Sequence, residues 1–255
     1  MGILDGKRLV ITGVLTDASL AFAVAQRAQA EGAQIVLTGA GRALSLTQRT
    51  ARKLSGDVPV FEFDATDPSH GDRLRGEVGA ALSGVDGVLH SIGFAPEVCL
   101  GDDFMPAQWP DVATAIQISA YSYKYLAESL VPLMARGGSI VGLDFDNTVA
   151  WPAYNWMGVA KSALESINRY LARQLGPSGI RCNLVAAGPI KTMAAKSIPG
   201  FAKFEDVWGE RAPLGWDVND PMPVANACVA LFSDLLTATT GSMIHVDGGY
   251  HAVGA

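Results

Sequence analysis

Short apolar segments alternate along the chain with longer segments of helical spacing. The short ones end at glycine or polar turn residues and are typical of buried strands: 7–12, 34–38, 58–63, 84–91, 139–143, 181–186 and 243–246. The longer ones predict helices: 19–31, 113–135, 154–176 and 221–234. Strands that alternate with helices favour a parallel sheet with helices on both faces. We therefore predict an α/β fold over residues 1–255, a single domain built on a Rossmann-like, doubly wound parallel sheet.

Composition and charge narrow the classes of function. Hydrophobic residues make up 49% of the chain and charged residues 17%, which suits a large buried core and argues against disorder. A formal net charge of −6 without a basic run disfavours nucleic acid as a partner. No segment approaches the roughly 18 apolar residues of a membrane span, and the N-terminus lacks a signal-peptide pattern. We expect a cytoplasmic protein that binds neither nucleic acid nor a membrane.

The cysteines and histidines give no sign of a metal site. Cys99, Cys182 and Cys228 are scattered and odd in number, and they show no metal-ligand spacing with one another or with the four histidines. We expect reduced cysteines and no bound metal. His90 has no carboxylate or second ligand at a suitable spacing, which favours a core residue whose ring is satisfied inside the protein.

The first strand, turn and helix predict a dinucleotide-binding unit, with the helix N-terminus directed at a pyrophosphate. The turn begins at Gly13, and Ser19 and Ala21 stand where further glycines of the usual G-x-G-x-x-G are expected. Small residues still let a backbone approach a phosphate, and the Ser19 hydroxyl can donate to it. The alternative is a plain turn between a strand and a helix.

Two further strand ends carry candidate cofactor groups, because ligands of open α/β sheets bind at the carboxyl edge. Asp64 and Ala65 follow the third strand, where the carboxylate could accept from an adenine amino group or instead cap the next turn. Ser91, Ile92 and Gly93 break the fourth strand where a cofactor would cross the edge.

The ends of the sixth and second strands add a carboxamide site and an open question. The turn at 187–192 is rigid, and its backbone and the Thr192 hydroxyl could hold a carboxamide. After the second strand stands Arg42, where an acidic residue commonly binds ribose hydroxyls. Arg42 could stack on adenine, accept a 2′-phosphate or be a solvated cation. The sequence therefore does not decide whether the protein prefers NADH or NADPH.

Tyr154 and Lys161 form the strongest candidate for catalysis. A spacing of seven residues is nearly two helical turns, so both side chains leave one face of a helix about 10.5 Å apart along its axis. A long ligand could touch both, with the lysine on a cofactor sugar and the tyrosine on a reacting oxygen. The ammonium would also favour a more acidic phenol. The alternative is a helix with a buried tyrosine and a lysine that reaches solvent.

These features together resemble the short-chain dehydrogenase/reductase superfamily, and within it the divergent enoyl-acyl carrier protein reductases, closest to the actinobacterial and mycobacterial type. Tyr154, Met157 and Lys161 carry the most specific match, because ordinary superfamily members have tyrosine and lysine four residues apart and Met157 stands at that position here. The remaining matches extend over the whole chain: 91–94, 118–123, 139–145, 152–166 and 183–190.

The resemblance implies a function and a role for each residue. An NADH-dependent reductase would reduce the trans-2 double bond of an enoyl thioester on acyl carrier protein or coenzyme A in fatty-acid elongation. Tyr154 would meet the thioester carbonyl, Phe145 would pack beside the double bond, Met157 would contact substrate, and Lys161 would bind the nicotinamide ribose. The resemblance implies further cofactor contacts at these positions: Gly13, Ser19, Leu20, Asp64, Ala65, Ser91, Ile92, Gly93, Ile190 and Thr192.

The segment 193–212 departs from the mycobacterial type by being shorter. Ile198, Phe201, Phe204, Val207 and Trp208 recur at spacings of three and four, which predicts a short amphipathic helix beyond residue 200. This helix could cover a bound acyl chain, with Lys196 and Lys203 facing an acidic carrier, or pack on the surface of the domain. A shorter cover favours medium over very long acyl chains. A second departure is Ala40, which stands where the mycobacterial type has an aromatic residue beside adenine.

Two other functions stay open at this point. A carbonyl reductase of the wider superfamily is disfavoured by the missing tyrosine four residues before Lys161, and a non-catalytic dinucleotide sensor is disfavoured by the presence of both Tyr154 and Lys161. The resemblance also implies a homotetramer, in which small residues such as Ala120, Ala127, Ala160 and Ala163 either permit close approach of helices between subunits or face the sheet.

Overall fold

The computed structural model describes residues 1–135, 137–193, 195, 199 and 201–254, without the side chains of residues 202 and 203. One sheet has the strand order β3-β2-β1-β4-β5-β6-β7 with every pairing parallel. The strands are β1 (Arg8–Thr12), β2 (Gln34–Gly39), β3 (Val60–Glu62), β4 (Gly87–His90), β5 (Gly138–Asp144), β6 (Ile180–Ala187) and β7 (Met243–Val246). The strand order reverses between β1 and β4, which is where open parallel sheets bind ligands. The predicted doubly wound sheet is confirmed.

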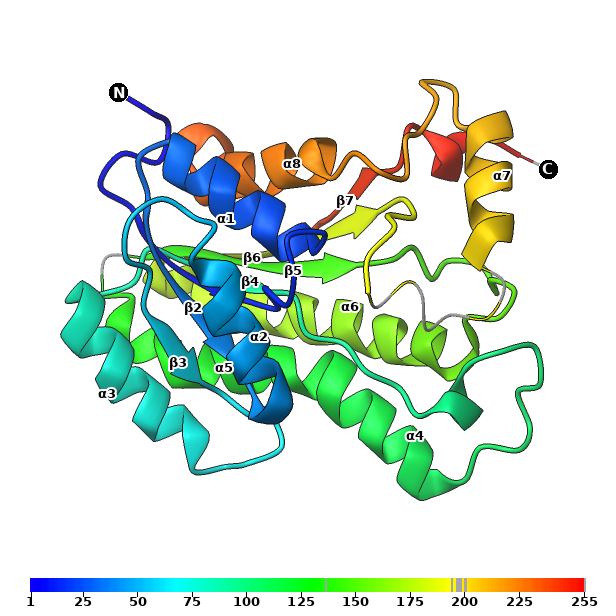
Figure 1. Cartoon of the computed structure of the whole chain (residues 1–255), viewed down its shortest axis with the longest axis horizontal. Helices are drawn as coiled ribbons and strands as arrows, with labels where there is room; N and C mark the ends of the chain where they lie inside the picture. The colour runs from blue at the N-terminus through cyan, green and yellow to red at the C-terminus, as the bar shows by residue number, and fades with distance from the viewer. Residues whose placement is uncertain (136, 194, 196–198, 200, 255) are drawn as a thin grey trace.

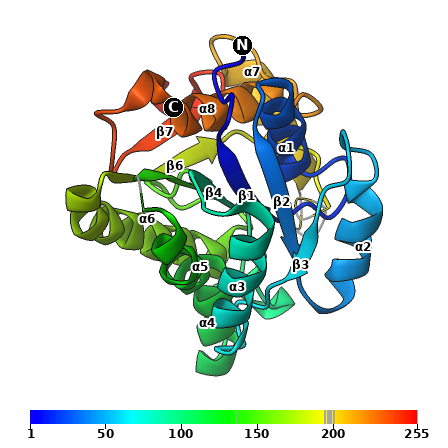
Figure 2. The ribbon, with the colours of Figure 1, turned by 90° about the vertical axis from the view of Figure 1, so that its left-hand side faces the viewer.

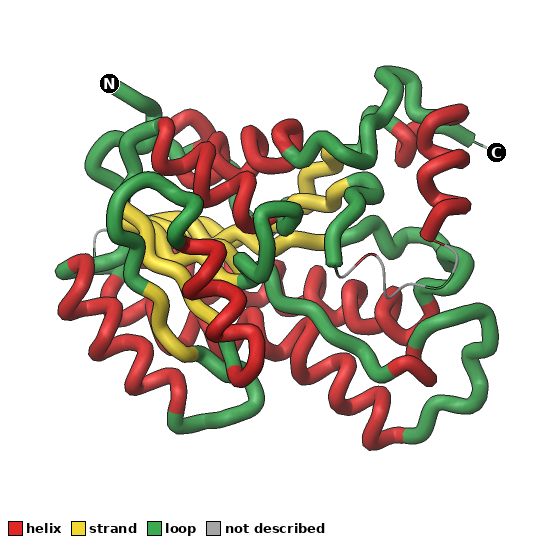
Figure 3. Tube along the Cα trace, in the orientation of Figure 1, coloured by secondary structure: helices red, strands yellow, loops and turns green. Residues whose placement is uncertain are grey.

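Helices cover both faces of the sheet, as Figures 1 and 2 show. One face carries α1 (Leu20–Ala30), α2 (Gly41–Ala51) and α8 (Met222–Phe232). The other carries α3 (His70–Leu82), α5 (Ser122–Leu130) and α6 (Asn155–Leu175), with α4 (Trp109–Ile116) leading into α5. Figure 3 shows the strands enclosed between these helices and α7 (Phe201–Arg211) standing apart from them, near the C-terminus.

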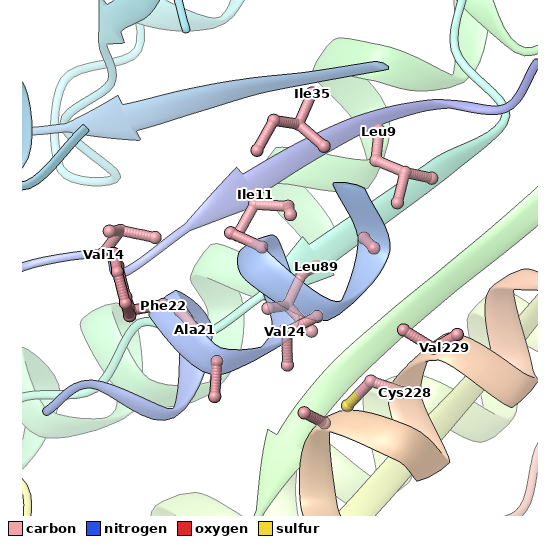
Figure 4. Close-up of a cluster of buried hydrophobic side chains, with 14 of the residues drawn as sticks. Leu9, Ile11, Val14, Ala21, Phe22, Val24, Ile35, Leu89, Cys228 and Val229 are labelled. Carbon is pink, nitrogen blue, oxygen red and sulfur yellow. The ribbon is translucent and has the colours of Figure 1, made fainter. Parts of the chain in front are cut away.

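The core explains why the strands are continuous apolar runs. Leu9 and Ile11 of β1 pack with Val24 of α1 and Val229 of α8 on one face of the sheet (Figure 4). Val10, between them in sequence, belongs to the hydrophobic cluster on the opposite face. Successive side chains of a strand point to opposite faces, so a sheet covered on both sides needs apolar residues at every position.

The predicted strands are confirmed, although 58–63 and 84–91 shorten to β3 and β4. The predicted helices at 19–31, 154–176 and 221–234 correspond to α1, α6 and α8. Helices α2 and α3 are additional to the predicted ones. Three glycines within α3, at 71, 76 and 79, weaken the helical pattern of that segment.

The predicted helix at 113–135 is wrong in its boundaries and its continuity. It begins at Trp109 as α4, passes through a π-helical turn at Gln117–Tyr121, and continues as α5 to Leu130. Pro110 fits the first turn of this helix because no intrahelical donor is needed there. A short 3-10 helix at Glu97–Cys99 lies in the connection between β4 and α4.

The amphipathic helix predicted beyond residue 200 is confirmed as α7. Phe204 and Trp208 are buried, and Phe201 and Val207 pack against the same cluster. Ile198 and Lys196 lie outside the described residues, as does the side chain of Lys203.

The small residues that the sequence analysis considered for contacts between subunits face the interior of the domain. Ala120, Ala127 and Ala160 are at most 1% exposed, and Ala163 packs against the core beneath the sheet. The alternative that they face the sheet is therefore correct, because they let α5 and α6 approach the strands. Among the helices that the structure describes, none is both long and apolar enough for a membrane crossing.

Candidate active site at the carboxyl edge of the sheet

The turn after β1 is held against the end of β4. The Thr12 hydroxyl donates to the carbonyl oxygen of Leu89 at 3.0 Å and accepts from the Ser91 N–H at 2.8 Å. Gly13 has a φ of 81°, and a Cβ there would lie 2.0 Å from the Ser91 carbonyl oxygen. Only glycine meets both conditions, so the structure brings predicted positions Gly13 and Ser91 into contact.

Ser19 stands at the N-cap of α1 and organises the same turn. Its hydroxyl oxygen accepts from the backbone N–H groups of Leu15 at 3.3 Å and Thr16 at 3.0 Å, and it does not cap the helix itself. The hydroxyl hydrogen therefore stays available to a ligand, as do the first N–H groups of α1. Leu20, the first residue of α1, is half-buried.

Asp64 is engaged in the turn that follows β3. Its Oδ1 accepts from the Thr66 N–H at 2.8 Å and from the Thr66 hydroxyl at 2.7 Å. The local turn considered in the sequence analysis is therefore present, and it leaves Oδ2 for another donor. Ala65 is half-buried beside it and packs against the core cluster of α3 and α5.

The turn after β6 is rigid, as predicted. The Trp216 indole N–H donates to the carbonyl oxygen of Pro189 at 2.7 Å, and Ile190 is buried. The Thr192 hydroxyl oxygen accepts from the Ala195 N–H at 3.1 Å, so its hydrogen remains free to donate.

A serine that the sequence analysis did not single out fixes the segment after β4. Ser119, fully buried in the π-helical turn, donates to the carbonyl oxygen of Phe94 at 2.8 Å and accepts from the Phe94 N–H at 2.9 Å. Ile92 and Gly93 directly precede this anchor, and a Cβ on Gly93 would meet no atom closer than 3.9 Å. The end of β4 is thus fixed in position and open at Gly93.

Lys161 and Asp144 form a buried charge pair whose hydrogen bonds are incomplete. The Lys161 Nζ donates to the carbonyl oxygen of Leu143 at 2.9 Å and lies 3.8 Å from Asp144 Oδ1. Neither carboxylate oxygen of Asp144 has a hydrogen-bond partner among the described residues. Burial raises the pKa of Asp144 to about 7, an effect that the Lys161 charge opposes. Burial lowers the pKa of Lys161, which Asp144 opposes. Such unmet groups in a site favour a ligand that supplies the missing partners.

Tyr154 lies one residue before α6 rather than within it. Its neighbours Ala153 and Asn155 have positive φ angles of 59° and 49°, so the simple helical offset to Lys161 does not hold at its first step. Tyr154 is 7% exposed, and burial followed by the Asp144 charge raises the pKa of its phenol. The expectation of a more acidic phenol is therefore wrong, and Tyr154 is a neutral hydroxyl donor.

His90 is a core residue, as predicted, but the expectation that its ring is fully satisfied is wrong, because its Nδ1 has no hydrogen-bond partner among the described residues. Its Nε2 lies 2.7 Å from the Ser122 Oγ, which in turn donates to the carbonyl oxygen of Ile118. Complete burial lowers the pKa of His90 to about 3, with a contribution from the Lys161 charge. His90 therefore stays neutral at physiological pH, and its ring packs edge-on against Tyr123.

An aromatic cluster closes the site beyond Tyr154. The Phe145 ring lies 4.9 Å from the Tyr154 ring and 5.4 Å from that of Trp151, measured between centroids. Trp208 of α7 is 5.9 Å from Phe145 and stacks on Tyr250 at 3.9 Å. Sequence reasoning predicted Phe145, Phe204 and Trp208 but missed Trp151 and Tyr250, which come from separate segments and share no periodic pattern.

Met157 is the one predicted substrate residue that packs elsewhere. It is half-buried against a separate cluster around Cys99 and Val112, on the α4 side of α6. The Met157 backbone N–H is also engaged within the protein, because it donates to the Tyr154 carbonyl oxygen at 3.0 Å.

The residues at this edge suit a reaction that develops negative charge on oxygen. A neutral phenol in an apolar pocket is a preorganised hydrogen-bond donor for an oxyanion. The buried ammonium uses one hydrogen on Leu143 and has two left for a polar ligand. The open α1 N-terminus and the free Ser19 hydroxyl suit a phosphate group.

Comparison with known proteins assigns the chain to a family. A family model described as "Enoyl-(Acyl carrier protein) reductase" matches residues 13–251. An enoyl-[acyl-carrier-protein] reductase [NADH] of Mycolicibacterium smegmatis is 49% identical, over 97% of this chain and 97% of the relative. Proteins of that name from Neisseria meningitidis and Escherichia coli are 37% and 35% identical, each over 98% of this chain and over 97% and 96% of their own lengths. The chain therefore belongs to the enoyl-acyl carrier protein reductase family of short-chain dehydrogenases/reductases.

Proposed function

We propose that this protein reduces the trans-2 double bond of enoyl thioesters, on acyl carrier protein or coenzyme A, with NADH in fatty-acid elongation. The observation that carries the proposal is the buried, neutral Tyr154 phenol beside Phe145, directly before the helix α6 that carries the buried Lys161 ammonium. Family membership and the names of the relatives support the same reaction.

The residues around the β1 turn fit a dinucleotide. Gly13, Ser19 and Leu20 would hold its pyrophosphate at the N-terminus of α1, since the Ser19 hydroxyl hydrogen is free. Asp64 and Ala65 would take the adenine end through the carboxylate oxygen Oδ2. Ser91, Ile92 and Gly93 line its path.

The nicotinamide end would lie between Lys161 and the turn after β6. Lys161 has donor hydrogens for the ribose hydroxyls, and Ile190 and Thr192 would hold the carboxamide. The bound cofactor supplies a hydride to the β carbon of the substrate.

Tyr154 and Phe145 act on the substrate. The phenol donates a hydrogen bond to the thioester carbonyl oxygen, whose negative charge grows as the enolate forms, before the α carbon is protonated. Phe145 packs beside the double bond and keeps water away from it. Met157 would contact the substrate only after a shift of its side chain, since it packs on the Cys99 cluster here.

One assay separates this function from its alternatives. The protein is mixed with NADH or NADPH and a trans-2-enoyl thioester, and the absorbance of the reduced cofactor is followed. Turnover with NADH supports the proposal and answers the question that the exposed Arg42 leaves open. Turnover of a ketone but of no enoyl thioester would make the protein a carbonyl reductase, and tight NADH binding without turnover would make it a sensor.

We further propose that segment 193–212 sets a preference for medium acyl chains. Phe204 and Trp208 of α7 pack on Phe145 and Trp151, so aromatic rings fill the space beyond the catalytic tyrosine. Each methylene that the pocket does not enclose forfeits about 0.8 kcal/mol. Values of kcat/KM for thioesters of increasing length should pass through a maximum, and a steady rise through the longest soluble chain would contradict the preference.

We also propose a homotetramer in the cytoplasm. Three large apolar residues are 38% to 69% exposed, which suits a contact between subunits: Tyr121 at the end of the π-helical turn, and Val159 and Tyr170 on α6. The buried free cysteines fit a reducing compartment. Light scattering at micromolar concentration tests the assembly, since a monomer would contradict it.

A further inference from the structure

Backbone strain in this protein concentrates around the candidate catalytic tyrosine. Among the described residues, three that are not glycine have a positive φ: Ser83, Ala153 and Asn155. Two of these three flank Tyr154 directly. A left-handed conformation is unfavourable for residues with a side chain, so surrounding contacts must hold this turn in place.

Those contacts come from a loop about fifty residues away in sequence. The Asn155 Nδ2 group donates to the carbonyl oxygens of Gly101 at 3.1 Å and Asp103 at 2.8 Å. The Ala153 N–H donates to Asp102 Oδ1 at 3.1 Å, and the Ala153 carbonyl oxygen accepts from the Gly101 N–H at 3.0 Å. Four hydrogen bonds thus clamp the residues on both sides of Tyr154.

The loop that supplies the clamp is itself anchored on α6. The Phe104 ring stacks on Trp156 with 4.5 Å between centroids and 14° between planes. The Trp156 indole N–H donates to the Phe104 carbonyl oxygen at 3.2 Å, and Cys99 is fully buried at the start of the loop. The clamp therefore has a fixed base and can hold the strained turn.

The Tyr154 hydroxyl does not fix its own position. No group in the described part of the chain forms a hydrogen bond with it, and the ring packs against Phe145 in a tilted pair, with 57° between the two ring planes. The direction of the phenol therefore follows from the backbone turn between Ala153 and Asn155. A shift of that turn moves the donor away from the reacting oxygen.

We propose that Asn155 is a positioning residue for the reaction, acting through Tyr154. Its side-chain amide ties the turn to loop 101–103 and so aims the phenol, while its tolerance of a positive φ lets the turn form. This inference rests on the proposed enoyl reductase function and adds to it a residue that touches neither substrate nor cofactor.

The substitution Asn155→Gly isolates the amide, because glycine adopts a positive φ without strain. We expect kcat to fall by about 10- to 100-fold, since a displacement of about 1 Å can cost that much. The dissociation constant of NADH should change little, because Lys161 and the β1 turn are untouched. Ser83→Gly is the matched control: it relaxes the remaining positive φ, at the C-terminus of α3, and should leave kcat unchanged.

A double-mutant cycle with Tyr154→Phe distinguishes positioning from a general structural role. If Asn155 acts through the phenol, Asn155→Gly lowers the residual kcat of the Tyr154→Phe enzyme by less than about twofold. An equal loss in both backgrounds, or an unchanged kcat of Asn155→Gly alone, would overturn the proposal.

Crystal structures of the wild type and of Asn155→Gly give a readout independent of turnover. A displaced Tyr154 ring in the variant supports the positioning role, and an unmoved ring refutes it. A wild type that fails to reduce any enoyl thioester refutes the proposed function, whichever way the ring behaves.

Discussion

The two halves of the site differ in how far the protein satisfies its own polar groups. In the turns after β1 and β3, Thr12, Ser19 and Asp64 bond to neighbouring backbone and a glycine supplies the conformation of the β1 turn, although the Thr16 hydroxyl is buried without a partner in the described part of the chain. At the end of β5, both oxygens of Asp144 lack partners in the described part of the chain, and Tyr154 sits between two strained residues. The first half is held in shape mainly by hydrogen bonds within the protein, whereas the second contains a buried charge pair whose burial is costly without a ligand.

This difference indicates which physical property of each half matters for its function. The first half works through shape, so its residues are exchangeable if the backbone keeps its path. The catalytic half works through buried hydrogen-bond donors and charges, so a change of one atom there alters chemistry more than fold. Substitutions in the two halves should therefore have different signatures.

The largest effect is expected from Lys161→Ala. Removing the ammonium takes away the charge that opposes the raised pKa of Asp144, so this buried carboxyl must take up a proton on folding at neutral pH; the variant should be less stable than the wild type and should bind no measurable NADH. Urea unfolding and NADH titration measure the two effects.

The double variant Lys161→Ala with Asp144→Asn sharpens this result. It removes the buried carboxyl that must take up a proton, so stability should return while NADH binding stays absent. Recovery of NADH binding in the double variant would show that Lys161 serves the fold and not the cofactor.

The second-largest effect is expected at Gly13, in the half of the site around the β1 turn. Gly13→Ala combines an unfavourable φ of 81° with a Cβ 2.0 Å from the Ser91 carbonyl oxygen, and should cost about 2 to 3 kcal/mol of unfolding free energy. Gly6→Ala is its control, because Gly6 has a φ of 73° and nothing within 4 Å of the added carbon. It should cost only about 1 kcal/mol. Equal costs for the two variants would mean that the contact with β4 is not needed.

The smallest effect concerns pH. The pKa of Asp144 rises to about 7 on folding from a usual value of 3.8, so the folded state binds a proton that the unfolded state has released between these values. This contribution to stability is present below about pH 4 and is lost as the pH rises to 7.

Comparison with Asp144→Asn isolates that contribution from other titrating groups. Relative to the variant, the wild type should lose unfolding free energy as the pH rises from 4 to 7, because the nearby Lys161 charge only partly opposes the raised pKa of Asp144. Urea unfolding at several pH values measures it, and parallel curves for the two proteins would show that Asp144 does not titrate in this range.

Much of the fold was predictable because it depends on local pattern. The buried strands are apolar at every position, and the resemblance to the enoyl-acyl carrier protein reductases is confirmed by the family match. The π-helical turn at 117–121 was not predictable, because Ser119 and Ser122 form their bonds to Phe94 and His90 only in the folded protein.

The candidate site divides in the same way. Gly13 and Lys161 stand out from spacing along the chain, and the structure places both at the carboxyl edge of the sheet. The turn around Tyr154 depends on loop 101–103, and the aromatic cluster joins Trp151 with Tyr250 from a segment a hundred residues away. Contacts of that kind leave no periodic signal in the sequence.

The most direct test of the account is to measure kcat for a trans-2-enoyl thioester and the dissociation constant of NADH in the wild type and in Tyr154→Phe. The account predicts turnover by the wild type, a loss of roughly 100- to 1000-fold in kcat on removal of the single hydroxyl donor, and an unchanged affinity for NADH. An unchanged kcat in Tyr154→Phe, or a loss confined to NADH affinity, would contradict the assignment of the buried phenol to the reacting oxygen.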